Sequence, residues 1–236
     1  FTSACGPLVY QDDVLPGLKG HYLVCEPAQN LVHRAAIVRD GTRLRLERVK
    51  GEEESEFLAS RDAWFHPISL AHTPTGGIAI VDFYREIIED YSAIPRHLQQ
   101  QYGLVNGKDR GRIWILEPDK TTIAPTPSLA GLDRVALMAE RESGIFWRRE
   151  TARRLLLEQG ETVASLDLDG WKSEEPGKRL AALRAADAGH FEQARGIEEE
   201  LLSPGFVESL PPALALQAAL SLGQSRDPRV EDALLR

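Results

Sequence analysis

The stretch that decides the fold is PISLAHTPTGGIAIVD, residues 67–82. Two short runs rich in apolar residues, 68–72 and 78–82, lie on either side of the turn sequence TPTGG. Runs of this kind separated by a few Gly-containing residues are typical of an antiparallel β-hairpin. The rest of the chain decides whether this hairpin belongs to a larger sheet.

Further runs of the same kind occur on both sides of the hairpin. The pair Asp40-Gly41 predicts a second hairpin, because both central positions of such a turn favour positive φ. The complete set of predicted strands is 3–10, 22–26, 31–38, 42–49, 68–72, 78–82 and 111–117. Strands at this spacing predict a meander of antiparallel sheets, as in a sandwich, a barrel or a propeller.

The composition changes near residue 125, after which Leu and Ala dominate and favour helix. Apolar residues recur with helical spacing in residues 144–160, which end on a Gly suited to a C-cap. Further helices are predicted at 176–188, 191–202, 212–222 and 228–235, the last with Val230, Ala233 and Leu234 facing the core. We therefore expect two domains, 1–124 and 125–236, the second an α-solenoid of HEAT-like repeats.

The bulk properties of the 236 residues exclude two classes of protein. A net charge of −8 argues against a nucleic-acid surface, which needs clustered Lys and Arg. No apolar run approaches the roughly 20 residues of a membrane span. The chain has no initiator Met and no signal-peptide pattern, so we expect it to begin inside a longer reading frame.

Five ordered segments carry a family resemblance: FTSACGPLVY, GHYLVCEPAQNLVHR, EFLASRDAWFHPISL, GGIAIVDFYREIIE and DRGRIWILEP. Together they resemble the end of the membrane-bound dehydrogenase domain of planctomycete and verrucomicrobial proteins, a family also described as PVC-type haem-binding proteins. That domain is similar to sugar and sorbosone dehydrogenase propellers. The segment IFWRRETARRLLLEQG resembles the first helical unit that follows the propeller. The resemblance covers residues 1 to about 165.

The resemblance implies that this chain holds the last blades of a β-propeller followed by a HEAT-like segment. Propeller relatives use pyrroloquinoline quinone and calcium, and family members carry haem c in a separate domain with a CxxCH motif that is absent here. We therefore expect no cofactor or metal held by this chain alone, and a periplasmic or extracellular location. The chain departs from the family at Phe65-His66-Pro67-Ile68, where Phe-Arg-Pro-Val is usual, and at residues 73–77.

Propeller geometry predicts where a site would lie. If residues 67–72 form an inner strand, the loop before that strand and the loop after residue 82 meet at one face. The residues expected there are His66, Asp62 and Arg85 as catalytic groups, and Arg61, Trp64, Asp82, Tyr84, Glu26, Asn30 and Arg34 as substrate- or cofactor-binding groups. Such a cluster suits a small-molecule pocket with an acid as base or calcium ligand. The alternative is that Arg61–Asp62 and Asp82–Arg85 are structural ion pairs between loops.

Cys5 and Cys25 are the whole cysteine inventory, too few for a disulfide scaffold or a zinc site. Because their strands would be antiparallel neighbours, the two residues should lie opposite each other, at a separation that suits a disulfide. A disulfide would indicate export to an oxidising compartment.

Two functions remain open from the sequence. The first is an enzyme that oxidises a sugar or alcohol and passes electrons to a haem domain of the same polypeptide, with the present chain inactive alone. The second is a binding module in which the propeller rim and the solenoid bind a protein or polysaccharide.

Overall fold

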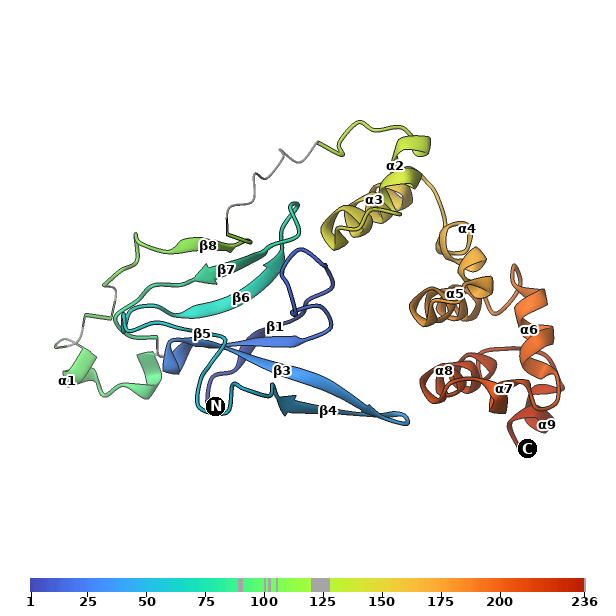
Figure 1. The fold of residues 1–236 in the computed structure, drawn as a ribbon, viewed down its shortest axis with the longest axis horizontal. Coiled ribbons are helices and arrows are strands. Elements are labelled where there is room, and N and C mark those ends of the chain that lie inside the picture. The colour runs from blue at the N-terminus through green and yellow to red at the C-terminus, as the bar shows by residue number, and fades with distance from the viewer. Residues whose placement is uncertain (89–90, 100, 102, 105, 120–127, 236) are drawn as a thin grey trace. The chain divides into compact units, whose positions relative to one another are not determined.

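The computed structural model describes residues 1–88, 91–99, 101, 103–104, 106–119 and 128–235. The chain divides into two compact units, residues 1–38 with 44–152, and residues 39–43 with 153–236. The predicted domain boundary at 124–125 lies outside the described residues. The predicted order, antiparallel sheets and then helices, is confirmed (Figure 1).

The first unit contains two antiparallel sheets. The larger sheet has the order β1-β2-β3-β4, with β5 beside β3, and the smaller sheet has the order β6-β7-β8. The strands are β1 Cys5–Val9, β2 Tyr22–Glu26, β3 Leu31–Asp40, β4 Arg43–Arg48, β5 Leu58–Ala59, β6 Pro67–His72, β7 Ile78–Asp82 and β8 Arg112–Leu116. All seven predicted strands form, and the two-residue β5 was not predicted because it is too short to show a pattern.

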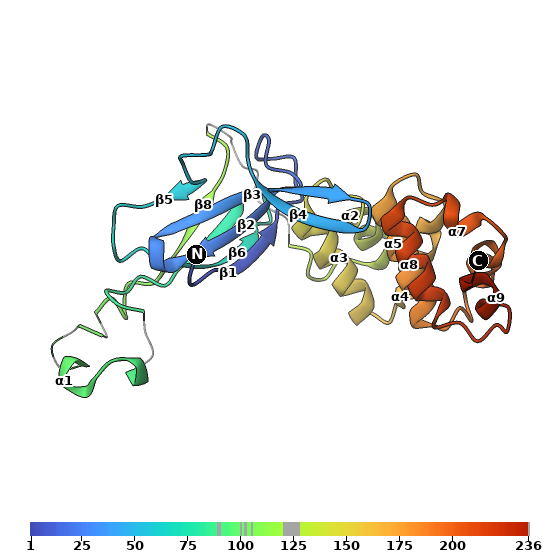
Figure 2. The ribbon, with the colours of Figure 1, turned by 90° about the horizontal axis from the view of Figure 1, so that it is seen from below.

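The long β3–β4 hairpin (Figure 2) has a different turn from the predicted one. Strand β3 continues through Asp40, so the two turn residues are Gly41 and Thr42. Of these two, Gly41 has positive φ, at 61°. A glycine at the first central position is the pattern of a type II′ turn, whereas Asp40-Gly41 would have given type I′.

A shared apolar core lies between the two sheets. Leu23 and Cys25 of β2 face it, together with Leu70 of β6 and Ile78 and Ile80 of β7, all at most 8% exposed. Ile78, Ile80 and Asp82 alternate along β7 and therefore share one face. Asp82 thus ends a core-facing row and is 1% exposed, so its carboxylate must find its partners inside the protein.

Strand β8 forms one edge of the smaller sheet. Ile113, Trp114 and Ile115 are 64%, 47% and 52% exposed, so both faces of β8 are open to solvent. In the register of the β7–β8 pair, Asp82 lies opposite Arg112 and Ile80 opposite Trp114. Opposed residues of an antiparallel pair point to the same face, so Arg112 and Trp114 extend the core-facing row of β7.

The remaining elements are helical. They are η1 Pro27–Gln29, η2 Tyr91–Ala93, α1 Arg96–Gln99, α2 Arg134–Glu140, α3 Phe146–Glu158, α4 Val163–Asp167, η3 Leu168–Lys172, α5 Pro176–Ala188, α6 Arg195–Leu202, α7 Phe206–Ser209, α8 Pro212–Leu222 and α9 Val230–Leu234. None of the helices in the described part of the chain has the length and hydropathy required to cross a membrane.

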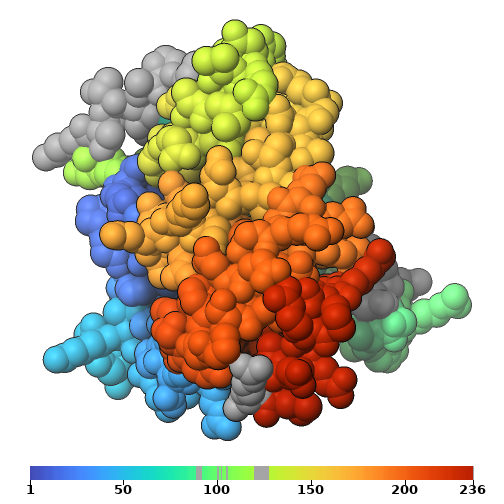
Figure 3. All heavy atoms as spheres, turned by 90° about the vertical axis from the view of Figure 1, so that its right-hand side faces the viewer, coloured from blue at the N-terminus to red at the C-terminus, as the bar shows by residue number. Residues whose placement is uncertain are grey.

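The second unit is built from helices whose buried residues form one apolar core, and its atoms, coloured orange to red, lie closely packed in Figure 3. Helices α5 and α8 begin at Pro176 and Pro212, since a proline at the first helical position needs no hydrogen-bond acceptor. Their buried residues form a core with Trp171, whose indole Nε1 donates to Glu200 at 2.8 Å. In α9, Val230 and Ala233 pack on this core, but Leu234 is 46% exposed and was wrongly predicted to face it.

Candidate functional site

Three loops meet at one end of the two sheets, as the strand order predicted. They are the η1 turn after β2, residues 60–66 before β6, and residues 83–88 and 106–111 of the connection between β7 and β8. The backbone N–H of Phe83 donates to His66 O at 2.9 Å, and that of Arg85 donates to Trp64 O at 3.2 Å. The loops before β6 and after β7 are therefore held together by main-chain hydrogen bonds.

Asp82 is the centre of this end of the unit. Its Oδ1 accepts from the backbone N–H of His66 at 2.9 Å and of Tyr84 at 3.0 Å. Its Oδ2 accepts from Arg112 Nε at 2.9 Å and from Trp114 Nε1 at 3.1 Å. Burial raises the pKa of Asp82, but these four hydrogen bonds outweigh it and hold the pKa below its ordinary value. A carboxylate with this many donors is a structural anchor, with no lone pair left for a base or calcium ligand.

Arg112 connects Asp82 to the aromatic residues around it. Its guanidinium lies 4.0 Å from the ring centroid of Tyr84 and 4.8 Å from that of Trp114, and its NH2 group lies 3.6 Å from Asp62 Oδ2. The predicted ion pair of Asp82 with Arg85 is therefore replaced by a pair with Arg112. We define the rim cluster as Asp62, Trp64, His66, Asp82, Tyr84, Arg112 and Trp114.

The sequence prediction missed Arg112 and Trp114. A partial signal was present, because a strand that pairs antiparallel with β7 begins near the end of the sheet at which β7 ends. The predicted strand begins at Gly111, so the sequence placed Arg112 near Asp82 but did not fix the register in which the two residues lie opposite each other.

His66 is 8% exposed and has one satisfied ring nitrogen. Nδ1 lies 2.8 Å from Pro27 O, and since a carbonyl only accepts, Nδ1 carries the proton. The other ring nitrogen, Nε2, has no hydrogen-bond partner among the described residues. Asn30, whose side chain donates to Phe65 O at 2.6 Å, fastens the same loop to the η1 turn.

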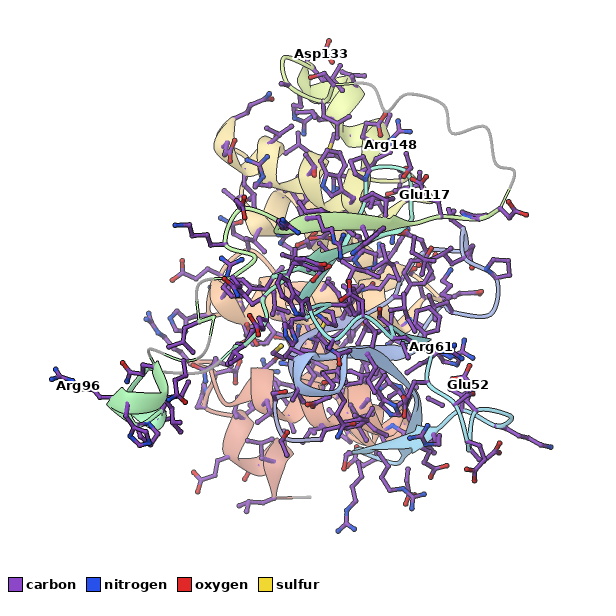
Figure 4. The ribbon with its side chains drawn as sticks, turned by 90° about the vertical axis from the view of Figure 1, so that its left-hand side faces the viewer. Glu52, Arg61, Arg96, Glu117, Asp133 and Arg148 are labelled. Carbon is purple, nitrogen blue, oxygen red and sulfur yellow. The ribbon has the colours of Figure 1, made fainter. Side chains whose placement is uncertain are left out.

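Of four other predicted site residues, three have partners outside the rim cluster, and the fourth, Arg61, has none among the described residues. Glu26 is buried and accepts from Ser3 Oγ at 2.6 Å. Arg34 pairs with Glu52. Arg85 donates to the backbone, with Gly107 O at 2.6 Å. Arg61 is exposed, projects outward (Figure 4), and forms no hydrogen bond or ion pair with another described residue.

A pocket of about 470 Å³ opens beside β8 and reaches the rim cluster. Its apolar walls include Leu58, Phe65, Ile80 and Leu116. Its polar and aromatic side is formed by Ser60, Asp62, Arg112 and Trp114. Mostly apolar walls with a few convergent polar groups are characteristic of ligand sites, and the volume lies in their usual range.

The residues of this end do not fit the cofactors that the family resemblance implies. No group of His, Cys, Asp or Glu side chains in the described ranges could hold a metal ion. Among the side chains that line the pocket or hold Trp114, Asp62 and Asp82 carry two negative charges against the positive charge of Arg112, which opposes a polyanionic quinone. Neither calcium nor pyrroloquinoline quinone is therefore assigned to residues of this chain.

Cys5 lies directly opposite Cys25 in the β1–β2 ladder, as predicted. Both side chains are free thiols, so the predicted disulfide is not formed in this structure. Burial, reinforced by the neighbouring Cys5, raises the pKa of Cys25 to about 12. Since the thiolate is the reacting species, this environment disfavours oxidation at neutral pH, and the disulfide stays a prediction.

Comparison with known proteins gives one match. Residues 1–120 match a family described as a domain of unknown function (DUF7133). Neither the curated proteins nor the solved structures contain a match to this chain. The geometry of the rim cluster and its pocket is therefore the basis for a functional conclusion.

Proposed function

We propose that the first unit is a binding module whose ligand contacts the rim cluster. The chain belongs to the family defined by the domain of unknown function DUF7133. The ligand class is a small polar molecule or a carbohydrate. The observation that carries this proposal is the pocket beside β8, which joins apolar walls to Asp62, Arg112 and Trp114.

The state of the charged groups supports binding rather than chemistry. Asp82 accepts from Arg112 Nε and from Trp114 Nε1, which fixes the indole of Trp114. Asp62 remains 44% exposed at the pocket, with one oxygen held by the backbone N–H of Trp64 at 3.0 Å. A site whose side chains are already held by hydrogen bonds, with one polar group left open to the pocket, is pre-organised for a ligand.

The same proposal places the two sheets as consecutive blades of a propeller. Four strands in the order β1-β2-β3-β4 form a meander, and residues of β1, β2 and β6 share the core between the sheets. Propellers bind ligands in loops at one end of their blades, which is where the rim cluster lies. The second unit would then be a HEAT-like solenoid, and the protein a periplasmic or extracellular one.

The experiment is a ligand screen on the full chain with a matched pair of variants. Sugars, nucleotides, amines and carboxylic acids are tested for a rise in the melting temperature and by ligand-observed NMR. Asp62→Asn should abolish the response, whereas Asp13→Asn should retain it, because Asp13 is a remote exposed carboxylate paired with Lys19. Binding that is unaffected by Asp62→Asn would place the ligand elsewhere and refute the proposal.

A second function, oxidation of a sugar or alcohol by a larger dehydrogenase-like protein, is favoured by one observation. The Nε2 atom of His66 is buried and has no hydrogen-bond partner among the described residues, and an imidazole nitrogen of this kind can serve as a general base. Full-length protein supplied with pyrroloquinoline quinone, calcium, aldoses and an artificial electron acceptor should then turn over. His66→Gln should remove that activity, and no turnover across the sugar panel would refute it.

A further inference from the structure

We infer that the pocket beside β8 binds a neutral sugar ring, stacked on the indole of Trp114 and hydrogen-bonded at its edge by Asp62 and Ser60. This inference rests on the proposed binding function and names its ligand. Three features of the pocket carry it: a fixed aromatic face, polar groups at one edge, and the balance of charge.

The aromatic face is held in place before any ligand arrives. The Nε1 of Trp114 donates to Asp82 Oδ2 at 3.1 Å, and the Arg112 guanidinium lies 4.8 Å from the Trp114 ring. The residue nevertheless remains 47% exposed and lines the pocket. An aromatic ring packs well against the C–H face of a sugar ring, since both surfaces are flat and apolar. Because the indole is already fixed, little side-chain entropy is lost on binding.

The polar groups lie where the hydroxyl groups of such a ring would need partners. Asp62 is a strong acceptor and is 44% exposed, with its Oδ2 3.6 Å from Arg112. Ser60 Oγ accepts from the backbone N–H of Asp62 at 3.1 Å, and its own proton has no acceptor among the described residues. The pocket therefore offers an acceptor and a donor beside an aromatic surface. Sugar hydroxyl groups can use both.

The charges select a neutral ligand. Asp62 and Asp82 carry two negative charges, and Arg112 is the one cation among the side chains that line the pocket or hold Trp114. Arg112 donates its Nε–H to Asp82 and has Asp62 Oδ2 3.6 Å from its Nη2, so two carboxylates already offset its positive charge before a ligand arrives. A ligand anion would instead meet a net negative site, which repels it. The volume of about 470 Å³ has room for at least one sugar ring.

The test uses the full chain and four neutral trisaccharides: maltotriose, cellotriose, mannotriose and xylotriose. Trigalacturonate is the anionic counterpart. Affinities are measured by isothermal titration calorimetry and by quenching of tryptophan fluorescence. At least one neutral trisaccharide should bind, and trigalacturonate should bind more weakly than that trisaccharide.

The variants locate the ligand. Trp114→Ala should weaken binding by at least about tenfold, because the stacking surface is lost. Trp114→Phe keeps a ring and should weaken it less, and Ser60→Ala should weaken it by a few-fold. Ile113→Ala is the matched control, since Ile113 is an exposed apolar residue of the same strand that does not line the pocket. Circular dichroism establishes that each variant folds.

The outcomes separate this inference from the proposed function. Neutral sugar binding that survives Trp114→Ala overturns the stacking site. If the ligand screen yields only an anionic or non-sugar ligand that depends on Asp62, the neutral-sugar inference fails while the binding function stands. If no ligand of any class binds, both fail.

Discussion

Asp82 offers the most direct test of how the site is built. Asp82→Asn keeps the shape of the side chain and one acceptor oxygen, which the N–H groups of His66 and Tyr84 can still use. The new amide NH2 would replace the Oδ2 that accepts from Arg112 and Trp114. The N–H groups of these two side chains would then point at another hydrogen-bond donor. Because both of these side chains are partly exposed, water can accept hydrogen bonds from them and so reduce the loss of stability.

We therefore expect Asp82→Asn to destabilise the first unit by about 2–3 kcal/mol. Asp82→Ala also leaves the N–H groups of His66 and Tyr84 without their acceptor and should cost about 3–5 kcal/mol. The chain has two units, so a global unfolding curve is a poor readout. Hydrogen exchange of peptides covering residues 60–88 reports the local opening free energy directly.

The acid dependence supplies a second measurement on the same residue. The pKa of Asp82 is lowered in the folded state, so its stabilisation is present above the unfolded pKa of about 3.9. It is lost as the pH falls through the lower folded pKa. The wild type should lose more local stability than Asp82→Asn does between pH 5 and the folded pKa. Equal exchange rates in the two proteins at pH 7, or equal acid dependence, would refute the role of Asp82 as an anchor.

Two further predictions concern the β1 strand. Gly6 has a φ of 54°, and a Cβ there would lie 2.5 Å from Ile68 O. Gly6→Ala should therefore lower the free energy of unfolding by about 1–2 kcal/mol through backbone strain and by about 1–3 kcal/mol through steric overlap. Gly17→Ala, with a φ of 70° and open space, should cost the strain alone. Equal losses of hydrogen-exchange protection in peptides covering residues 1–38 of the two variants would contradict this. Oxidation should join Cys5 to Cys25 in a loop of about 20 residues and add about 3 kcal/mol. Intact mass after alkylation, with Cys5→Ser as control, detects the bond, and two alkylated thiols after prolonged oxidation would exclude it.

The sequence predicted the strands well because each is bounded by a turn signal. Strand β7 ends at Asp82, and Gly76-Gly77 precedes it, so both its limits and its neighbour β6 were readable. The same regularity placed Trp64 and His66 beside Asp82 and Tyr84 without any side-chain information. The opposition of Cys5 and Cys25 was also correct.

The function of each side chain was harder to predict, because it depends on partners from distant strands. Asp82 was expected to bind substrate or cofactor, but its carboxylate is saturated by four donors, two of which come from β8, about thirty residues later. Arg85 was expected in the site, but its guanidinium binds backbone carbonyls of its own loop region. Sequence spacing predicts which loops meet. Whether a side chain such as Asp82 already has all its hydrogen-bond partners can be seen only in the three-dimensional structure.

The exposed strand β8 has a consequence for the behaviour of the protein in solution. Its sequence RIWIL combines strong β-forming residues with an open edge, which is the kind of segment that nucleates intermolecular sheets. Arg110 precedes this segment, and Glu117-Pro118 follows it. Charges and a proline at these positions act as gatekeepers, since both oppose the addition of another chain. Removing Pro118 or neutralising Glu117 should therefore lower the concentration at which the protein stays in solution.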